Sequence, residues 1–235
     1  MKSLVINKKD LVHNINVLKN FSQMQILRNE KKYQIIAVVK GNGYGLGLVE
    51  YSQILIDNGI DCLAVSTFEE AVILRRAGIA KDILMLSSTA IKEELELLIK
   101  EDIIITIGSE NVVKIINEIA EKHKEIRVHV AIDTGFGRYG FLYNDENFLK
   151  TIKSLKSNVK IDGIFSHFSL SYYKNNKWTN TQFNRFLDVL HAFRAAKINI
   201  DVAHICNSSG YINYPKMHLN ATRIGSAFLG RVERR

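Results

Sequence analysis

Short apolar runs alternate with longer segments of helical periodicity along most of the chain. Most of these runs are continuous rather than alternating, which is typical of parallel strands that are buried on both faces. We therefore expect eight strands. The runs cover residues 35–39, 62–65, 83–86, 103–107, 127–132, 161–166, 201–205 and 221–224.

Segments with apolar residues at three- and four-residue spacing fill most gaps between the runs. Asp10 can cap the first helix, and Ser109 can cap another. Thr67 and Glu70 have the spacing of a capping box, and Gly78 is expected to end the helix that Thr67 begins. The predicted helices cover residues 11–24, 49–58, 68–77, 92–100, 110–122, 146–157 and 180–196.

This alternation predicts an α/β fold. Eight strand–helix units within 235 residues fit the (β/α)₈ barrel of the TIM type, with eight parallel strands. A doubly wound open sheet is the alternative, but it needs fewer strands and a switch point, and no G-x-G-x-x-G follows the first strand. Because no repeat or linker is visible, we expect residues 1–235 to form one barrel domain.

Composition narrows the class of protein. Hydrophobic residues make up 46% of the chain and charged residues 24%, as in ordinary globular proteins. The net charge of +8 could indicate nucleic acid, an anionic ligand or a basic surface. Because the positive charges are scattered and no basic block is interleaved with aromatic residues, we expect no nucleic-acid partner.

Targeting signals are not visible in the sequence. The first ten residues lack the apolar core of a secretory signal, and no apolar run approaches the ~18 residues of a membrane span. Cys62 and Cys206 lie in apolar segments without metal-like spacing, so we expect buried thiols and no metal site. These features predict a cytoplasmic protein with reduced thiols and no membrane partner.

Lys40 stands where the first apolar run ends, and a glycine-rich loop follows it. A lysine at the end of a buried strand can lose its charge by desolvation, and a neutral amine is a nucleophile. The flexible backbone beyond it can approach a ligand closely. This pattern favours an amine that forms a Schiff base with a carbonyl cofactor, beside a phosphate-binding loop. The alternative is a strand-to-helix turn with an incidental lysine.

Polar, basic and glycine residues follow the carboxyl ends of several predicted strands. In a barrel these ends meet at one mouth, where active sites lie. Each residue alone could be a cap, a turn residue or a satisfied interior histidine, but their joint placement predicts a site. Ser208 and the amides near Gly225 and Ser226 suit a phosphate dianion. The candidates are Lys40, Tyr44, Arg138, His167, Asn207, Ser208, Arg223, Gly225 and Ser226.

Five motifs resemble those of the alanine racemase family, in the same order and over nearly the whole chain. The resemblance implies a pyridoxal 5'-phosphate enzyme with a barrel as its N-terminal domain. It implies an isomerase that interconverts the L- and D-forms of a small amino acid, most simply alanine, as a cell wall precursor. The motifs are AVVKGNGYGLG, HVAIDTGFGRYGF, GIFSHF, HICNSSG and RIGSAFLG.

The resemblance also implies roles for the residues that bind the cofactor. Lys40 would be the Schiff-base lysine and one of the two groups that move the α-proton. The phosphate would be held by Tyr44, Ser208, Gly225 and Ser226, and Asn207 would belong to the same cofactor-binding set.

Arg223 would face the pyridine nitrogen, and His167 would support the ring and Arg223. Because an arginine cannot readily give up a proton, the ring would stay unprotonated and be a weaker electron sink. Related barrel decarboxylases carry an acid at this position, so Arg223 favours a racemase. Arg138 would lie near the cofactor phenolate and the substrate carboxylate.

Some positions depart from the family pattern. Leu46 stands where the family usually has histidine, and Gly41 and Gly43 replace typical alanines. Ala131 occupies a position where many members have a lysine that orients the arginine corresponding to Arg138. The placement of Arg138 is therefore open at this point.

Family members continue into a β-rich C-terminal domain, which supplies a catalytic tyrosine to the partner subunit of a homodimer. This sequence has no such β-domain after Gly230, and no motif assigns Tyr139, Tyr172 or Tyr211 to the role of second base. We therefore expect the chain to bind the cofactor and to have little racemase activity alone. A homodimer is implied for a full-length form.

Four alternatives remain open from the sequence. The chain could be part of a serine racemase of the same family. It could be a non-catalytic, single-domain protein of pyridoxal-phosphate homeostasis, although the lysine and phosphate motifs of those proteins differ. A barrel decarboxylase is disfavoured by Arg223, and a structural or basic binding module leaves the residues at the strand ends unexplained.

Overall fold

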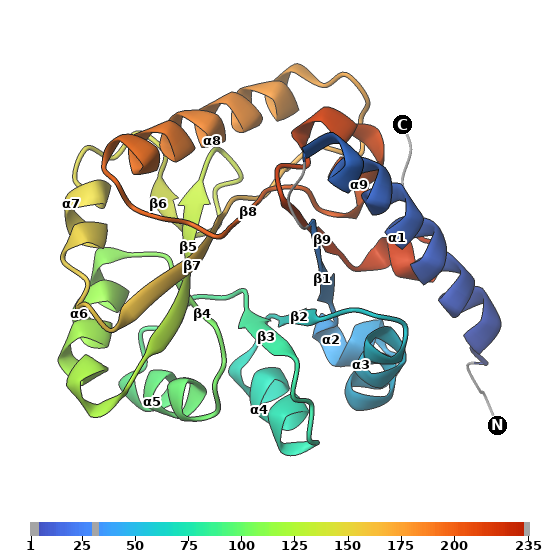
Figure 1. The fold of residues 1–235 in the computed structure, drawn as a ribbon, viewed down its shortest axis with the longest axis horizontal. Coiled ribbons are helices and arrows are strands. Elements are labelled where there is room, and N and C mark those ends of the chain that lie inside the picture. Colours follow the sequence, from blue (N-terminus) through green and yellow to red (C-terminus); the bar gives the residue numbers. More distant parts are fainter. Residues whose placement is uncertain (1–4, 30–32, 233–235) are drawn as a thin grey trace.

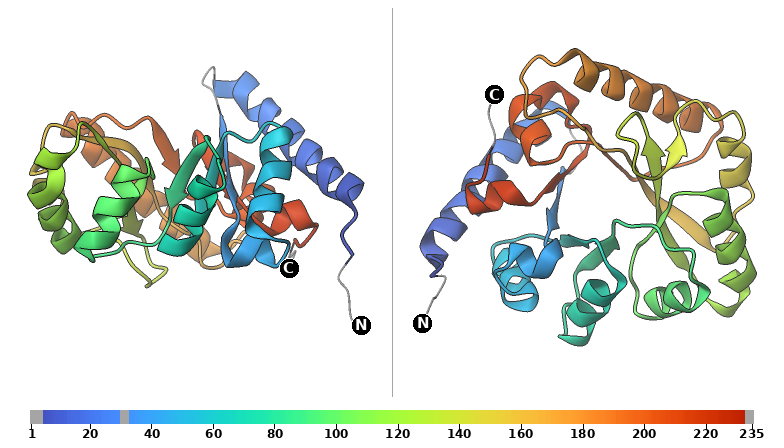
Figure 2. Two further views of the ribbon diagram at one scale, coloured as in Figure 1. Left: turned by 90° about the horizontal axis from the view of Figure 1, so that it is seen from below. Right: turned by 180° about the vertical axis from the view of Figure 1, so that it is seen from behind.

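A computed structural model describes residues 5–29 and 33–232 of the chain. Eight parallel strands form a nearly closed barrel with helices around it, as the sequence predicted (Figures 1 and 2). The order of strands is β3-β2-β1-β9-β8-β7-β5-β4. These strands are β1 (Gln34–Val38), β2 (Cys62–Val65), β3 (Asp82–Met85), β4 (Ile105–Ile107), β5 (Ile126–Asp133), β7 (Val159–Phe165), β8 (Val202–His204) and β9 (Ala221–Ile224).

The two strands at the ends of this order, β3 and β4, meet through a short bridge. Leu84 pairs with Ile104 in parallel. The amide of Ile104 donates to the carbonyl of Ile83, and the amide of Met85 donates to the carbonyl of Ile104, both over 2.9 Å. The barrel therefore closes here through few hydrogen bonds. A further short strand, β6 (Phe141–Leu142), pairs with β5 beside the barrel and was not predicted.

Helices fill most of the gaps between strands, and their ends differ from the prediction by a few residues. Two short helices at the carboxyl ends of strands, α2 and α9, were not predicted. The helix expected over residues 146–157 is shorter, and the one expected to reach Lys122 ends in a 3₁₀ turn. The helices are α1 (Lys8–Asn29), α2 (Lys40–Tyr44), α3 (Leu48–Asp57), α4 (Phe68–Arg76), α5 (Lys92–Lys100), α6 (Glu110–Ile119), α7 (Phe148–Lys153), α8 (Lys177–Ala195) and α9 (Ser208–Asn213).

The predicted caps are partly confirmed. Thr67 Oγ1 accepts a hydrogen bond from the amide of Glu70 over 3.3 Å, and Ser109 Oγ accepts one from Val112. The prediction for Asp10 is wrong, because α1 begins at Lys8 and Asp10 lies inside its first turn. Asn7 lies before that turn, and its side chain accepts from the amide of Lys9.

Two apolar layers hold the barrel together. One lies between the strands and the surrounding helices, and the smaller one fills part of the barrel interior. Cys62 and Cys206 are both buried free thiols, as predicted. The interior layer consists of Ile36, Val38, Cys62, Ala64, Leu84, Ile104 and Ala221.

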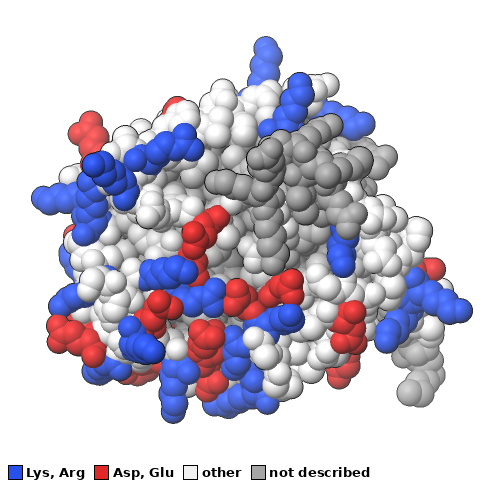
Figure 3. Space-filling model, viewed as in Figure 1, with Lys and Arg blue, Asp and Glu red and all other residues white. Residues whose placement is uncertain are grey.

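Charged side chains on the surface form ion pairs between neighbouring elements. Figure 3 shows basic and acidic side chains interspersed over the lower part of one face. Arg127 on β5 pairs with Asp82 and Asp162 at the amino-terminal end of the barrel, over 2.8 and 2.6 Å. Within residues 5–29 and 33–232, no helix has the length and apolar character needed to span a membrane.

Candidate active site

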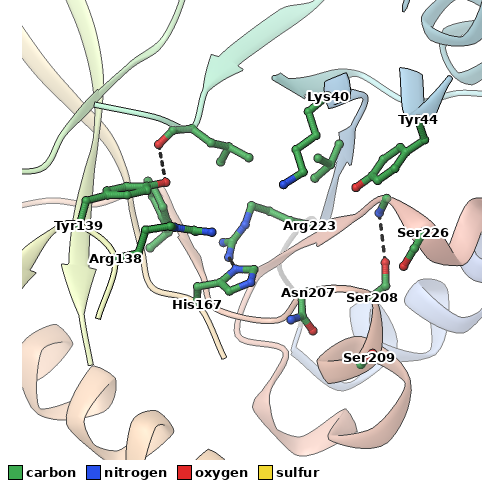
Figure 4. Close-up of a pocket in the computed structure, with 14 residues that line it drawn as sticks. Lys40, Tyr44, Arg138, Tyr139, His167, Asn207, Ser208, Ser209, Arg223 and Ser226 are labelled. Carbon is green, nitrogen blue, oxygen red and sulfur yellow. Dashed lines mark hydrogen bonds between the residues drawn. The ribbon is translucent and has the colours of Figure 1, made fainter. Parts of the chain in front are cut away.

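A cavity of about 340 Å³ opens at the carboxyl ends of the strands, within the range of small-molecule sites. All nine candidate residues from the sequence line it, and Figure 4 labels eight of them, all except Gly225, around one space. Apolar residues from the strand ends complete the wall. The lining residues are Val38, Lys40, Tyr44, Leu86, Arg138, Tyr139, Phe165, His167, Asn207, Ser208, Ser209, Arg223, Gly225 and Ser226.

The lysine loop forms a left-handed turn directly after β1. Gly41, Asn42, Gly43 and Tyr44 all have φ between 53° and 64°. Side chains are strained in this region, so the two glycines suit the turn better than alanines would. The Asn42 side chain accepts from the amide of Leu48 over 2.9 Å, which closes the loop onto α3.

A carboxylate on α4 also fixes the lysine loop. Glu70 Oε1 accepts from the amide of Asn42 over 3.1 Å, and Oε2 accepts from the amide of Ser66 over 3.2 Å. The return bond of the expected capping box therefore goes to Ser66 rather than to Thr67. Hydrogen bonds therefore join the loop that carries Lys40 to α3 and to α4.

Lys40 extends from the end of β1 into the cavity (Figure 4). Its side chain is exposed, so the desolvation predicted from its place after a buried strand is not present. The cationic groups of Arg138 and Arg223 line the same cavity. The site therefore gathers three basic side chains around one space, which suits an anionic ligand.

One end of the cavity is lined by small groups and amides. Ser208 Oγ accepts from the amides of Gly225 and Ala227, over 3.1 and 3.3 Å. A side chain at position 225 would overlap the hydroxyl of Tyr44, so only glycine leaves the Tyr44 ring in place. Asn207, rather than Ser208, caps α9, because its side chain accepts from the amide of Gly210 over 2.9 Å.

Arg223 is buried at the other side of the cavity. Its guanidinium donates to the carbonyl of Ser166 over 2.7 Å and to Nδ1 of His167 over 3.0 Å. It also donates to Nδ1 of His204. Burial lowers the pKa of Arg223 to about 10, which leaves it charged at neutral pH. Among the described residues, the Arg223 guanidinium is therefore held by neutral acceptors and not by a carboxylate.

Three histidines, the buried His129 and His204 and the half-buried His167, are neutral around this arginine. Because arginine only donates, Nδ1 of His167 and of His204 must accept, which places the proton of each ring on Nε2. His204 Nε2 then donates to Nδ1 of His129 over 3.0 Å. Burial lowers the pKa of His129 to about 4 and, together with the charge of Arg223, holds the pKa of His167 and His204 well below the ordinary value.

Arg138 lies on the loop between β5 and β6. The Asp133 carboxylate shapes this loop, because it accepts from the amides of Gly135, Phe136 and Gly137 over 2.8 to 3.2 Å. The guanidinium lies over the ring of Phe136 at 4.7 Å. Arg138, whose placement the sequence left open, therefore lies at the cavity wall, and the Phe136 ring contacts its guanidinium.

Sequence reasoning missed two features of the site. Tyr139 lines the cavity, but nothing in its motif marked it. His129 and His204 lie inside the barrel behind Arg223. The signal for His129 was available, because Arg127, His129 and Ala131 alternate with valines and so share one face of β5.

Comparisons with known proteins show the family of the chain. The family described as alanine racemase, N-terminal domain, matches residues 6–232. The alanine racemase of Clostridium tetani is 37% identical over 227 residues, which cover 96% of this chain and 56% of that protein. The alanine racemase of Methanococcus maripaludis is 36% identical over 217 residues, with 91% and 57% covered.

Solved structures show the same fold. The alanine racemase of Clostridium difficile 630 in complex with cycloserine has a TM-score of 0.87 and 31% identity. The match covers 97% of this chain and 62% of that one. The chain thus spans a little more than half the length of the curated relatives named above. With the family matched over nearly all of its residues, the chain belongs to the alanine racemase N-terminal domain family.

Proposed function

We propose that this chain is the cofactor-binding barrel of a pyridoxal-phosphate-dependent amino-acid racemase, with alanine as the simplest substrate. One observation carries the proposal: the nine residues that the sequence motifs single out line a single cavity, with Lys40 and Arg223 both facing it. A serine racemase of the same family would use the same cavity.

The amide-lined end of the cavity fits a phosphate group. Tyr44, Ser208, Gly225 and Ser226 would hold it, with Asn207 fixing the backbone turn beside them. The absence of a Cβ at position 225 supports this, because a side chain there would displace Tyr44. The Ser208 hydroxyl, whose oxygen accepts from the amides of Gly225 and Ala227, keeps its own proton to donate, and a hydroxyl donor of this kind suits a dianion.

The opposite end of the cavity fits a pyridine nitrogen. The cofactor, when bound, supplies an electron sink for the electron pair left by removal of the α-proton. Arg223 offers only donors and stays charged at neutral pH, so it would hydrogen-bond to the ring nitrogen without protonating it. His167 orients Arg223 through its Nδ1. This arrangement favours racemisation over reactions that need a strong electron sink.

Lys40 has two tasks in this proposal. Its amine would hold the cofactor covalently, and the same amine, when free, would move a proton at the substrate α-carbon. Racemisation needs a second acid–base group on the other face of that carbon. We assign no residue of this chain to that task, and we propose that a homodimer of the full-length protein completes the site.

Proton exchange tests the proposal. The chain is incubated with pyridoxal phosphate and either L- or D-alanine in D₂O, and loss of the α-proton signal is followed by NMR. We expect faster exchange for one enantiomer, because Lys40 serves one face of the α-carbon, and no exchange in Lys40→Ala.

Other results would favour the alternatives. Cofactor binding without exchange of either enantiomer would contradict the proposal and favour a homeostasis protein. Release of carbon dioxide would indicate a decarboxylase. Rapid conversion of L- to D-alanine by the chain would show that it contains both acid–base groups, against the proposal. The same exchange measurement with L-serine distinguishes serine from alanine as the substrate.

A further inference from the structure

Two arginines line the cavity, and they are held by different means. Arg223 is buried and donates to the carbonyls of Ser166 and His204 and to the rings of His167 and His204. Arg138 is exposed, and within residues 5–29 and 33–232 it makes no hydrogen bond or ion pair. Ala131 on β5 presents only a methyl group beneath its loop. Something other than a polar partner must hold the Arg138 guanidinium.

Two aromatic rings contact that guanidinium. Its carbon lies 4.7 Å from the centre of the Phe136 ring and 5.0 Å from the centre of the Tyr139 ring. Both distances lie within the range of a cation–π interaction. Because the rings come from residues on either side of Arg138 in the chain, one loop supplies both the charge and its support.

Tyr139 is itself anchored at its far end. Its hydroxyl donates to the carbonyl of Leu86 over 2.6 Å, which joins the loop after β5 to the end of β3 (Figure 4). The Asp133 carboxylate fixes the start of the same loop by accepting from three amides. The ring of Tyr139 is therefore held in place on the wall of the cavity, beneath the charge of Arg138.

Phe136 is also held against the site. Its ring meets the ring of His167 edge-on, with centres 4.9 Å apart and planes at 89°. His167 in turn accepts from Arg223. The two arginines are thus connected through Phe136 and His167, although one is exposed and the other buried.

We propose that Tyr139, assisted by Phe136, is a positioning residue that holds Arg138 ready for the carboxylate of an amino-acid substrate. An arginine that pairs with a fixed carboxylate has already used part of its donor fork. An arginine held by aromatic faces keeps all its N–H groups for the incoming anion, which it can bind through two parallel hydrogen bonds. The inference rests on the proposed function, because it takes a carboxylate as the ligand of this cavity.

The first test uses the cofactor-free chain and so does not depend on the proposed function. The side-chain resonances of Arg138 are assigned by NMR with the Arg138→Lys variant. We expect upfield ring-current shifts of the Arg138 δ-protons and ε-NH. These shifts should decrease in Tyr139→Leu, in which only the Phe136 ring remains against the guanidinium, and persist in full in Tyr139→Phe, which keeps both rings. Resonances at ordinary arginine positions in the unmodified chain would overturn the proposal.

The second test measures binding of propionate, a carboxylate without an amino group, by titration of the same resonances. Tyr139→Leu should weaken propionate binding by about two- to fivefold, the size expected of one cation–π contact near a surface. In the Arg138→Ala background, propionate binding is followed through the ring protons of His167, and Tyr139→Leu should then have no further effect. An equal loss in both backgrounds would overturn a role that acts through Arg138.

A control and a cofactor titration separate this inference from the proposed function. Tyr173→Leu changes an exposed ring outside the cavity lining and should leave propionate binding unchanged. The affinity for pyridoxal phosphate, followed by absorbance, should change less than twofold in Tyr139→Leu. If the unmodified chain binds no cofactor, the proposed function fails, while the Arg138 resonances still decide the role of Tyr139.

Discussion

Tyr44 and Gly225 come from opposite ends of the chain, and the tyrosine hydroxyl occupies the space that a side chain at position 225 would need. Two ring carbons of Tyr44 would also lie 2.9 and 3.0 Å from a Cβ there. β1 and β9, which precede these residues, are neighbours in the barrel. The pairing of the first and last strands therefore builds the amide-lined end of the cavity.

We expect Gly225→Ala to weaken binding of pyridoxal phosphate by about tenfold or more, the equivalent of one hydrogen bond to a charged group. The added methyl group displaces the Tyr44 ring from the phosphate position. Absorbance titration measures the effect. Gly108→Ala is the matched control, because position 108 is outside the cavity lining and its Cβ would lie 3.2 and 3.3 Å from Ser88 atoms and 3.6 Å from the Gly140 nitrogen. Equal affinity in both variants would refute the assignment of Tyr44.

The lysine loop offers a pair of glycines for a second prediction. Gly41 and Gly43 both have φ near 64°, but a Cβ at 41 meets nothing within 4 Å, whereas one at 43 would lie 3.2 Å from Tyr51. Each change to alanine should lower the free energy of unfolding by about 1 kcal/mol through backbone strain. Gly43→Ala should lower the free energy of unfolding by more than Gly41→Ala, because Tyr51 must also shift. Urea unfolding measures both, and equal losses would count against the contact.

The two arginines of the cavity should respond differently to conservative replacement. Arg223→Lys removes the guanidinium fork from buried acceptors, so it should lower the free energy of unfolding by about 1.5–3 kcal/mol. Arg138→Lys should change it by less than about 0.5 kcal/mol, because the side chain is exposed. Urea unfolding of the cofactor-free chain compares them. Similar losses for both variants would contradict the contacts described for Arg223.

Acid should destabilise the fold through its buried histidines. Burial lowers the pKa of His129 and of His218 to about 4, whereas an unfolded histidine titrates near 6.5. Between these values the unfolded chain binds more protons, so stability is full above pH 6.5 and falls as the pH decreases towards 4. Each histidine contributes up to about 1.4 kcal/mol per pH unit.

Unfolding in urea at pH 7, 6 and 5 measures this slope. His218→Phe keeps an aromatic ring against Tyr211 and removes one titrating group. In this variant the slope of the free energy of unfolding against pH, between pH 6 and 5, should decrease by the contribution of about one proton, roughly 1.4 kcal/mol per pH unit. A slope that does not change would show that His218 is not a neutral buried group.

The order of elements in the barrel could be predicted because strands buried on both faces leave continuous apolar runs. β2 and β9 have the bounds expected from residues 62–65 and 221–224, and the other predicted strands differ by one or two residues at their ends. β6 could not be predicted, because it consists of Phe141 and Leu142 and depends on pairing with β5. Asp10 was taken for a cap because the helix was expected to begin three residues too late.

The residues of the cavity could be predicted because the carboxyl ends of parallel strands converge. Their contacts could not be predicted. The bond between His129 and His204 joins strands that are not adjacent, so it depends on the geometry of the barrel interior. The exposure of Lys40 depends on the left-handed turn after it, which the sequence marked only as flexible.

The measurement that tests the account most directly is a titration with pyridoxal phosphate, followed by borohydride reduction and mass mapping of the peptides. We expect an absorbance band that is trapped as a stable adduct on Lys40 and is lost in Lys40→Ala. Lys92→Ala removes a lysine paired with Glu118 on the surface and should behave like the unmodified chain. An adduct on another lysine, or a band that survives Lys40→Ala, would contradict the account.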